Sequence, residues 1–371
     1  MTTTSRRSFL ALGASALACS RLPGAQLLAP ADLTWTCVDD WRIEGRAFAN
    51  RKSPYDRLPA EAEGVVRKAV WNLSRNSAGM AVRFLSSTPE VHVRYRLTDG
   101  QLDMVHMPAT GVSGADLYAR APNGKMQWVQ VARPKSRDVT AKLTDSMPAN
   151  PDGKPHEWLL YLPLYNGVET LEIGVPAGNT IEPAPPPPGK PVLVYGTSIV
   201  HGACASRPGM AWPAIMGRTL ERETINLGFS GNGRMETEVG RFLCELDPAV
   251  FVVDCLPNMS AKLVEERTVP LVRQLREARP DTPILLVEDR TFTNAWANPG
   301  RLASHQQRRA KLNESFAKLK ESGVTNLHLL SADGLLGNDH EGATDGSHPN
   351  DLGMYRQANK VADRVWPLLV D

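Results

Sequence analysis

The 371-residue sequence lacks the features that mark several large classes of protein. Its apolar runs all fall short of the roughly 18 to 20 residues that a membrane-spanning helix requires. Charge of one sign is never concentrated either: 42 Lys and Arg against 40 Asp and Glu give a net charge of +2, without a block of like charges. Nothing therefore favours a nucleic acid or an acidic membrane surface as a partner. The hydrophobic fraction of 42% is instead ample for packed cores, in a chain long enough for two domains.

Motifs for metal and nucleotide chemistry are missing as well. No two histidines stand at i,i+3 or i,i+4 spacing, and neither a Gly-x-x-x-x-Gly-Lys-Ser loop nor a strand-linked Gly-x-Gly-x-x-Gly occurs. The five cysteines match no zinc pattern, so we expect no metal and no cofactor. Apart from Cys19, the cysteines are expected to be buried small hydrophobes with at most one disulfide, whose pairing stays open. These four are Cys37, Cys204, Cys244 and Cys255.

The first 25 residues differ in character from the rest of the chain. Arg6 and Arg7 precede Ser-Phe-Leu, an apolar run follows over residues 11–19, and Pro23-Gly-Ala comes next. This order predicts a twin-arginine-like export signal over residues 1–25, and hence a periplasmic or extracellular protein. Two alternatives stay open. One is a chance basic start on a cytosolic enzyme, and the other is a lipoprotein cut that leaves Cys19 acylated.

Four successive prolines within residues 181–190 mark the one strong internal boundary. Because such a run cannot join a helix or the middle of a sheet, it predicts a stiff spacer. Before the spacer, apolar residues alternate with polar ones, as at Val91, Val93, Tyr95 and Leu97. This period of two predicts strands with one buried face. Residues 30–180 are therefore expected to form an antiparallel β-sandwich domain.

After the spacer, short continuous apolar runs alternate with amphipathic stretches. Strands buried on both faces are predicted at residues 191–195, 224–227, 250–254, 283–287 and 326–330. Helices are predicted over residues 235–246, 271–279 and 306–321. This alternation implies a flavodoxin-like α/β domain over residues 191–371, with a parallel sheet covered by helices. Reactive groups in such a sheet lie beyond the carboxyl ends of its strands.

Ser198 directly follows the first of these strands, in Gly196-Thr-Ser-Ile. Its hydroxyl would stand at the edge of the sheet, and its backbone N–H would be free to meet a developing oxyanion. Taken alone, the position suits a helix N-cap better. Evidence for a nucleophile must come from other segments.

A second segment, Asp345-Gly-Ser-His348-Pro349, offers the remaining groups of a serine hydrolase. A carboxylate three residues before a histidine can reach its Nδ1 proton in a tight turn, which Gly346 permits. Pro349 restricts the preceding backbone to an extended conformation. The alternative is a solvated loop, because these residue types are all common in turns.

Two further strand ends complete a set. Gly231 follows the second strand, where flexible backbone lets an amide approach a substrate closely. Asn258 follows the third, with a side-chain amide that could donate to an oxyanion. Each is an ordinary turn residue in isolation, but their common position at the strand ends of one sheet favours a shared site.

These blocks resemble, in order, those of the SGNH (GDSL-type) hydrolases, across the whole C-terminal half. The resemblance implies that Ser198 is the nucleophile, His348 the general base and then acid, and Asp345 its orienting carboxylate. It also implies an oxyanion hole formed by the Ser198 and Gly231 N–H groups and the Asn258 side chain. The chain departs from the family at Thr197, where aspartate is common, and at Leu256-Pro257, where a glycine pair is common. These departures suggest a distinct branch with altered surroundings of the oxyanion hole.

The N-terminal half indicates which branch of the SGNH hydrolases the chain resembles. Gly114-Ala-Asp116-Leu-Tyr118 resembles the Gly-x-Asp-Leu-Tyr signature of a β-sandwich domain fused ahead of certain SGNH hydrolases. For Asp116 and Tyr118 we favour a structural role over a substrate contact. The candidate substrate-binding residues are His201, Arg207, Asn232 and Asp116. A helix-face histidine and a surface arginine remain the simpler interpretations of His201 and Arg207.

The expected function is an exported serine ester hydrolase that removes a small acyl group, with O-acetyl esters of carbohydrate as the favoured substrate. One alternative is a lipase or thioesterase, which would present an exposed apolar patch beside the cleft. Another is a carbohydrate-binding protein whose hydrolase domain has lost activity. The acyl group, the alcohol and the oligomeric state stay open.

Overall fold

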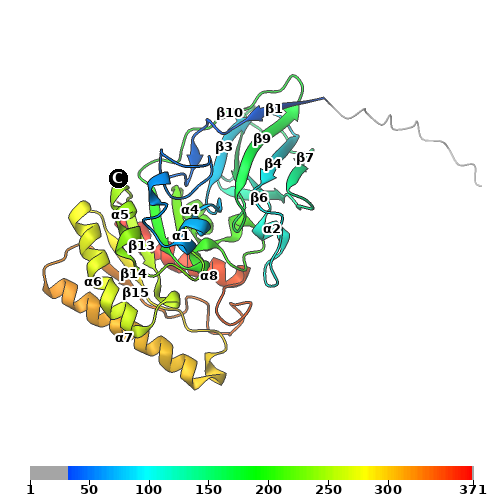
Figure 1. The fold of residues 1–371 in the computed structure, drawn as a ribbon. Coiled ribbons are helices and arrows are strands. Elements are labelled where there is room, and N and C mark those ends of the chain that lie inside the picture. The colour runs from blue at the N-terminus through cyan, green and yellow to red at the C-terminus, as the bar shows by residue number, and fades with distance from the viewer. Residues whose placement is uncertain (1–31, 370–371) are drawn as a thin grey trace, which may run out of the picture. The chain divides into compact units, whose positions relative to one another are not determined.

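Two antiparallel sheets make up most of the N-terminal half of the computed structural model, which describes residues 32–369. The first sheet has the order β1-β9-β4-β7, formed by Leu33–Cys37, Val168–Pro176, Val91–Leu97 and Asp138–Thr144. The second has the order β10-β3-β8-β5-β6, formed by Glu182–Pro183, Ala81–Ser86, His156–Tyr161, Asp116–Arg120 and Met126–Val131, with β2 (Ile43–Glu44) beside β3. The predicted β-sandwich is confirmed (Figure 1).

The sandwich core follows directly from the alternating pattern. In β4 the residues with odd numbers are buried and those between them are partly or fully exposed. Val93 and Tyr95 of one sheet share a hydrophobic cluster with Phe84 and Trp158 of the other. Phe84 and Trp158 stack with ring centroids 6.1 Å apart. One face of each sheet is thus covered by the other.

Five parallel strands form the sheet of the C-terminal half. They are β11 (Val192–Gly196), β12 (Thr224–Gly228), β13 (Val250–Asp254), β14 (Ile284–Val287) and β15 (Leu327–Leu330). Their spatial order is β12-β11-β13-β14-β15, which is the flavodoxin-like order. All five predicted strands are confirmed, because each is a continuous apolar run that only a sheet covered on both faces buries.

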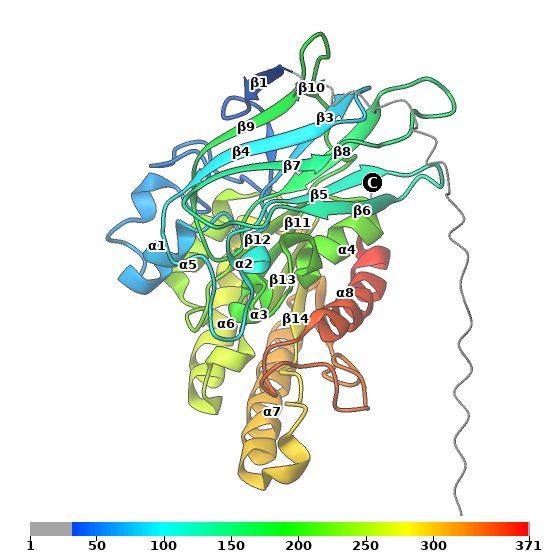
Figure 2. The same cartoon turned by 90° about the vertical axis from the view of Figure 1, so that its right-hand side faces the viewer.

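Helices cover both faces of this sheet (Figure 2). On one face lie α3 (Ser198–His201), α4 (Trp212–Leu220) and α8 (Asp351–Val365), which pack against Val194 and Val252. On the other lie α5 (Thr237–Glu245), α6 (Ala261–Ala278) and α7 (Pro299–Glu321), which pack against Tyr195 and Val253. Short 3-10 turns complete the chain at η2 (Pro208–Met210), η3 (Leu256–Asn258), η4 (Ala295–Ala297) and η5 (Trp366–Leu368).

Two of the predicted helices begin earlier than expected. α6 starts at Ala261 rather than at residue 271, since the Ser260 hydroxyl accepts a hydrogen bond from Leu263 N at 3.2 Å and caps it. Its interior Pro270 hides this continuity in the sequence. α7 starts at Pro299 rather than at residue 306, with Asn298 as the capping residue.

Residues 45–76 do not belong to either sheet of the sandwich, contrary to the expectation for residues 30–180. This segment contains η1 (Ala60–Ala62) and α1 (Lys68–Ser74). Leu58 and Val70 are completely buried in the same cluster as Leu193 and Phe229 of the α/β half. Residues 33–369 belong to one compact unit, so the two halves share part of their core.

The proline-rich segment lies against the protein instead of standing free. Glu182 and Pro183 pair with Leu85 and Phe84 as an edge strand. The prolines that follow, together with Arg83 and other side chains, line a cavity of about 250 Å³. The domain boundaries at residues 181–190 remain a prediction.

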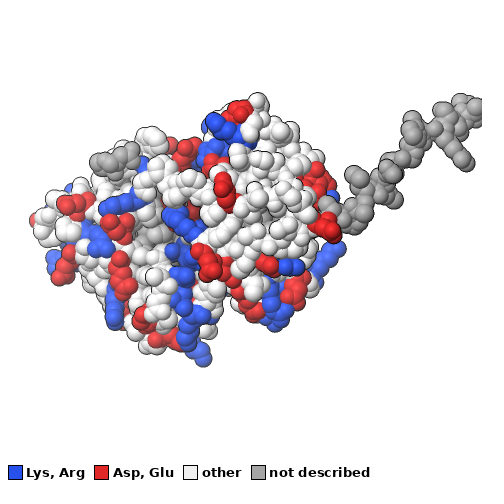
Figure 3. Space-filling model, turned by 90° about the horizontal axis from the view of Figure 1, so that it is seen from above, with Lys and Arg blue, Asp and Glu red and all other residues white. Residues whose placement is uncertain are grey.

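The remaining expectations concern cysteines, membrane spans and surface charge. The four cysteines among the described residues are free. Cys204 and Cys255 are buried as expected, whereas Cys37 is exposed and Cys244 is half-buried. No helix within residues 32–369 is long and apolar enough to cross a membrane. Acidic and basic side chains are intermixed on the face shown in Figure 3. The predicted export signal and Cys19 lie outside the described residues.

Candidate active site

Three strand ends meet at one edge of the parallel sheet. In the register of the sheet, Gly196 at the end of β11 lies opposite Gly228 of β12 on one side and Asp254 of β13 on the other. The loops that leave these strands carry Ser198, Gly231 and Asn258. Because the strands run parallel, the three residues emerge at the same carboxyl edge, as the sequence predicts.

The backbone around Ser198 is tightly fixed. Thr197, not Ser198, is the N-cap of α3, and its hydroxyl accepts a hydrogen bond from Ile199 N at 3.3 Å. The Ser198 carbonyl accepts from the N–H groups of Gly202 and Ala203 at 3.0 and 2.9 Å. The Ser198 hydroxyl therefore does not serve as the cap. As the first residue of the helix, Ser198 also has a backbone N–H without an intrahelical acceptor.

The three groups of the predicted triad are in contact. Ser198 Oγ lies 2.8 Å from His348 Nε2, and His348 Nδ1 lies 2.7 Å from Asp345 Oδ2. Since the carboxylate can only accept, His348 Nδ1 carries the proton and Nε2 is left to accept from the serine hydroxyl. Gly346 has φ +89°, and a Cβ there would meet the Asn294 side chain at 2.7 Å, so this turn requires glycine.

Asp345 is held in its charged form. Burial alone would raise the pKa of this carboxyl. The hydrogen bond from the His348 ring, with those from the backbone N–H groups of His348 and Ser347, outweighs burial and lowers the pKa to about 2. The carboxylate is thus ionised throughout the neutral range, which is the state that can orient a histidine and stabilise its cation.

The Gly231 loop presents backbone rather than side chains to the site. Gly231 has φ +69° and is exposed, and a Cβ there would meet no atom within 4 Å. Its carbonyl accepts a hydrogen bond from Arg234 Nε at 3.0 Å, which fixes the plane of the following peptide. Two residues on, Gly233 packs directly onto the Gly196 carbonyl. The loop and the strand that carries the nucleophile are therefore in backbone contact.

Asn258 closes η3, the short turn after β13. The residue is half-buried, and its Oδ1 is buried without a hydrogen-bond partner among the described residues. Its backbone N–H donates to the Cys255 carbonyl at 3.1 Å, which holds the turn. With the amide oxygen turned inward, the amide nitrogen is the atom available at the edge of the sheet.

Two residues of the N-terminal half that the sequence did not single out support this edge. The buried Arg57 guanidinium donates to the carbonyls of Gly228 and Asn226 at 2.7 and 3.2 Å, just before the Gly231 loop. Tyr165 donates to the Ser198 carbonyl at 3.3 Å. Neither contact has a local signature, because both partners are far apart in the chain.

A buried ion pair lies beneath the same edge. Arg290 Nη2 contacts both carboxylate oxygens of Asp254 at 2.6 Å, and Gln357 of α8 donates to the same carboxylate at 3.0 Å. All three side chains are completely buried. Asp254 ends β13, Arg290 follows β14, and α8 follows the Asp345–His348 turn, so the pair connects segments that carry site residues.

Two of the four predicted substrate-binding residues cannot contact a substrate in this structure, because their side chains are completely buried. His201 stacks on Tyr165 with ring centroids 4.1 Å apart and donates from Nε2 to the Leu164 carbonyl at 2.7 Å. Asp116 accepts from Arg207 and from Gly209 N at 2.9 and 2.8 Å. Asp116, which begins β5, therefore joins the sandwich to the loop before α4.

The other two candidates are partly exposed and already engaged. Arg207 contacts Asp116 and lies over the Trp128 ring at 4.9 Å. Asn232 accepts from Arg67 Nη1 at 2.6 Å through Oδ1 and follows Gly231 directly. Of the four, Asn232 is the one whose position in the chain keeps it beside the predicted oxyanion hole.

Two family models match the chain. Residues 189–365 match the GDSL-like lipase/acylhydrolase family. Residues 33–181 match a model named GxDLY, described as the N-terminus of Esterase_SGNH_hydro-type. No curated protein matches the chain.

Similar solved structures cover nearly the whole chain. A proposed GDSL-like lipase from Bacteroides ovatus ATCC 8483 is 34% identical with a TM-score of 0.85, over 91% of this chain and 98% of that one. The salicylyl-acyltransferase SsfX3 from a tetracycline biosynthetic pathway is 20% identical with a TM-score of 0.68, over 90% and 94%. An acetyl xylan esterase from Butyrivibrio proteoclasticus is 10% identical with a TM-score of 0.54, over 90% and 98%. The last two similarities show the fold alone.

Proposed function

The chain belongs to the GDSL-like lipase/acylhydrolase family, with a GxDLY-type N-terminal half, and on that premise we propose that it is a serine ester hydrolase. The observation that carries the proposal is the continuous chain of contacts from Ser198 Oγ through His348 to Asp345. A solvated loop gives no reason for the Asp345–His348 turn to place its side chains in line with Ser198.

In the first half of the reaction, Ser198 Oγ attacks the carbonyl carbon of the ester while His348 Nε2 takes its proton. Asp345 stabilises the imidazolium that results. His348 then returns the proton to the alkoxide of the alcohol, which leaves as the acyl-enzyme forms. Water attacks the acyl-enzyme in the second half, again with His348 as base, and releases the acid and the free serine.

The oxyanion that forms in both halves needs donors placed in advance. We assign this role to the backbone N–H groups of Ser198 and Gly231 and to the Asn258 amide nitrogen. The common register of β11, β12 and β13 supports the assignment, as does the inward Oδ1 of Asn258.

An activity-directed probe tests the nucleophile. Incubation with a fluorophosphonate should label Ser198, and Ser198→Ala should abolish both labelling and hydrolysis of p-nitrophenyl acetate. Mass spectrometry of the labelled peptide identifies the residue. Full-length protein that folds normally but fails to label would instead favour a carbohydrate-binding protein with an inactive hydrolase half.

For the substrate we propose a small acyl ester, with O-acetyl groups on a glycan as the favoured class. The similarity in fold to an acetyl xylan esterase supports this class, as does the presence of a β-sandwich beside the hydrolase sheet. An acetate-release screen over acetylated plant, algal and bacterial glycans, with Ser198→Ala as control, tests it. If no glycan released acetate and long-chain esters were hydrolysed, the result would favour the lipase or thioesterase alternative.

Export is a separate proposal that rests on the sequence of residues 1–25. Arg6 and Arg7 stand before an apolar run, which is the arrangement of a twin-arginine signal. Cell fractionation should find the mature protein outside the cytoplasm, and Arg6→Lys with Arg7→Lys should retain it inside. Metabolic labelling with a fatty acid distinguishes a signal cut from acylation of Cys19.

A further inference from the structure

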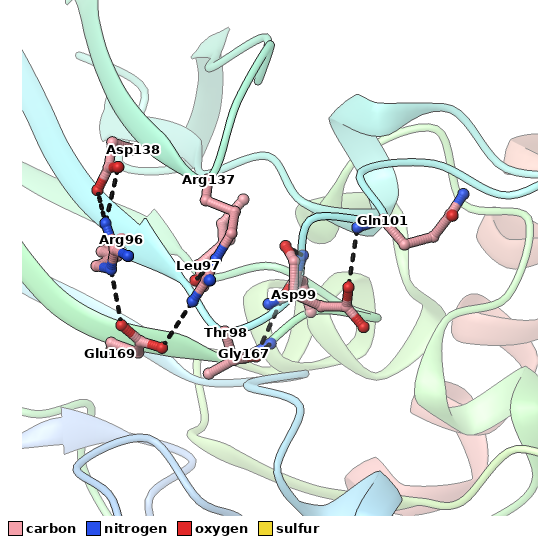
Figure 4. A network of polar contacts seen from close by, with 10 residues as sticks. Arg96, Leu97, Thr98, Asp99, Gln101, Arg137, Asp138, Gly167 and Glu169 are labelled. Carbon is pink, nitrogen blue, oxygen red and sulfur yellow. Dashed lines mark hydrogen bonds and ion pairs between the residues drawn. The ribbon is translucent and has the colours of Figure 1, made fainter.

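A loop of the sandwich half, residues 99–107, begins from a rigid base (Figure 4). Arg137 donates to the Leu97 carbonyl at 3.0 Å and to the Glu169 carboxylate at 3.0 Å. Thr98 N donates to the Gly167 carbonyl at 3.0 Å, and Gln101 N donates to Asp99 at 2.9 Å. The start of the loop is thus held by the Arg137 side chain and by backbone and side-chain hydrogen bonds around the ends of β4 and β9.

The far end of the loop is fixed in the other half of the protein. Residues 104–107, which we call the Met104–Met107 hairpin, close through hydrogen bonds in both directions between Met104 and Met107, at 2.9 and 3.0 Å. Met107 is only 2% exposed and belongs to the cluster that contains Ile199 and Trp212. Met104 packs against the same cluster. Both methionines thus pack into the cluster that also contains Ile199 of α3, the helix that Ser198 begins.

Within the Met104–Met107 hairpin, the two residues between the methionines are the exposed ones. Val105 is 107% exposed, although a valine on a fixed hairpin gains nothing from contact with water. His106 is exposed too, and its ring centroid lies 5.8 Å from that of His348. The hairpin therefore presents a hydrogen-bonding side chain beside the predicted general base, with a fully exposed apolar side chain next to it in the sequence.

We propose that the Met104–Met107 hairpin forms the wall of the active site that contacts the alcohol part of the ester, and that Val105 and His106 determine which alcohol is accepted. The inference rests on the proposed function. It assigns a substrate contact to the sandwich half of the chain, at residues outside the Gly-x-Asp-Leu-Tyr signature.

The position beside His348 decides which part of the ester is contacted. The acyl carbonyl must point its oxygen at Ser198 N, Gly231 N and Asn258. The leaving oxygen must face His348 Nε2, because that nitrogen protonates it. Groups next to His348 therefore meet the alcohol, whereas the carbonyl oxygen lies at the strand ends.

The two side chains fit a hydroxylated ring better than a plain alkyl chain. The methyl groups of Val105 can lie against the C–H face of a sugar, and either ring nitrogen of His106 can exchange a hydrogen bond with a neighbouring hydroxyl. Because His106 is exposed, water can replace a missing hydroxyl, so we expect a moderate preference for the hydroxylated alcohol and not its exclusive acceptance.

Two ester series on the full-length protein test the inference. In one, the acyl group is acetyl and the alcohol is an acetylated methyl xyloside, ethanol or p-nitrophenol. In the other, the alcohol is p-nitrophenol and the acyl chain runs from acetyl to octanoyl. We expect Val105→Ala with His106→Ala to reduce the kcat/KM ratio of the xyloside ester over ethyl acetate by about tenfold, chiefly through KM. The order of preference along the acyl series should stay unchanged.

Deacylation supplies an internal control, because the alcohol has left before that step. Its rate constant, from the burst kinetics of p-nitrophenyl acetate, should be the same in the double variant and in the unaltered protein. His106→Gln, which keeps a hydrogen-bonding group, should recover most of the lost preference. Trp366→Ala, an exposed apolar residue of η5, should change neither series.

The outcomes separate the inference from the proposed function. Equal losses for all alcohols, or a changed acyl preference, would overturn the role of the hairpin while Ser198 labelling stayed intact. Loss of labelling in the double variant would also overturn it, since the residues would then support the triad and not the substrate. Hydrolysis that survives Ser198→Ala would overturn the proposed function itself.

Discussion

A single carboxylate controls the state of the candidate general base. With its pKa lowered to about 2, Asp345 remains ionised at every pH at which the protein is expected to work. Protonation of Asp345 therefore cannot account for a loss of activity in mild acid. Protonation of Asp345 itself can matter only in strong acid.

We expect Asp345→Asn to lower kcat by about 10³- to 10⁴-fold, because an amide cannot hold His348 in the required tautomer. Steady-state hydrolysis of p-nitrophenyl acetate between pH 4 and 9 measures the effect. Circular dichroism checks the fold. A variant within tenfold of the unaltered protein would show that the carboxylate is dispensable.

Asn258 offers a second test at this scale. Loss of one oxyanion donor typically costs about 100- to 1000-fold in rate. We predict a loss of this size in kcat for Asn258→Ala, with an unchanged melting temperature, because its side chain makes no hydrogen bond that holds the turn. Cys244→Ala, a half-buried change on α5, is the matched control. Activity close to that of the unaltered protein would remove Asn258 from the oxyanion hole.

His201 makes stability depend on pH. Complete burial, reinforced by the nearby Arg57 cation, lowers its pKa well below 6.5. The folded state therefore keeps the ring neutral while the unfolded chain takes up a proton, so stability falls as pH falls below 6.5. One such group lowers the free energy of unfolding by about 1 kcal/mol over the first pH unit.

Urea titrations at pH 6.5 and 5.5 measure this dependence. His201→Gln, which keeps a donor for the Leu164 carbonyl but does not titrate, should lose about 1 kcal/mol less between the two values than the unaltered protein. Identical pH dependence in the two proteins would show that His201 is not the group responsible. Asp345 contributes in the same direction, but only below its ordinary value of 3.8.

At the scale of secondary-structure elements, Asp254 connects β13, the end of β14 and α8 through Arg290 and Gln357. Removal of one partner from a buried pair typically costs about 3 to 5 kcal/mol, since the other charge is left without compensation. We predict a loss of this size in the free energy of unfolding for Arg290→Met. The exposed pair of Arg94 with Glu172 supplies the control.

Arg94→Met should cost less than about 1 kcal/mol, because water screens an exposed pair. Urea denaturation at pH 7 measures both variants. Replacement of Asp254 and Arg290 together by Leu should restore part of the loss. Equal losses in the free energy of unfolding for Arg290→Met and Arg94→Met would show that the buried pair contributes no more to stability than the exposed one.

The elements that the sequence predicted are those whose burial is local. A strand such as β13, apolar at five successive positions, can only be covered on both faces, and the Gly-Thr-Ser turn after β11 needs no distant partner to be recognised. The sequence did not predict the start of α6, because charged residues are frequent in its first half and Pro270 interrupts the helical pattern. The roles of Arg57 and Tyr165 could not be predicted either, because both side chains bind backbone carbonyl groups, which every residue type has.

At the scale of the whole molecule, the two halves are joined by buried contacts. Asp116 of the sandwich binds the loop before α4, and Leu58 and Val70 complete the core of the α/β half. The proline-rich segment suggested a boundary between two domains. Residues 45–76, which precede it in the sequence, nevertheless pack into the core of the α/β half. Hydrophobic pattern alone could not predict this, because it reports that a residue is buried and not against which sheet.

We therefore predict one cooperative unfolding transition. Far-ultraviolet circular dichroism, which reports on both halves, and tryptophan fluorescence should give the same urea midpoint within error. Asp116→Ala should shift both curves together. Two separate transitions, or a shift of one curve alone, would show that the halves unfold independently.

Gly231 and Gly233 stand two residues apart and set different limits on how this protein could be re-engineered. A Cβ at position 233 would lie 1.9 Å from the Gly196 carbonyl oxygen, whereas one at 231 meets open space. Saturation libraries should thus return glycine alone at 233 but tolerate Asn or Asp at 231, where a left-handed φ is the only constraint. A search for variants that accept new acyl groups can therefore vary position 231 but not position 233.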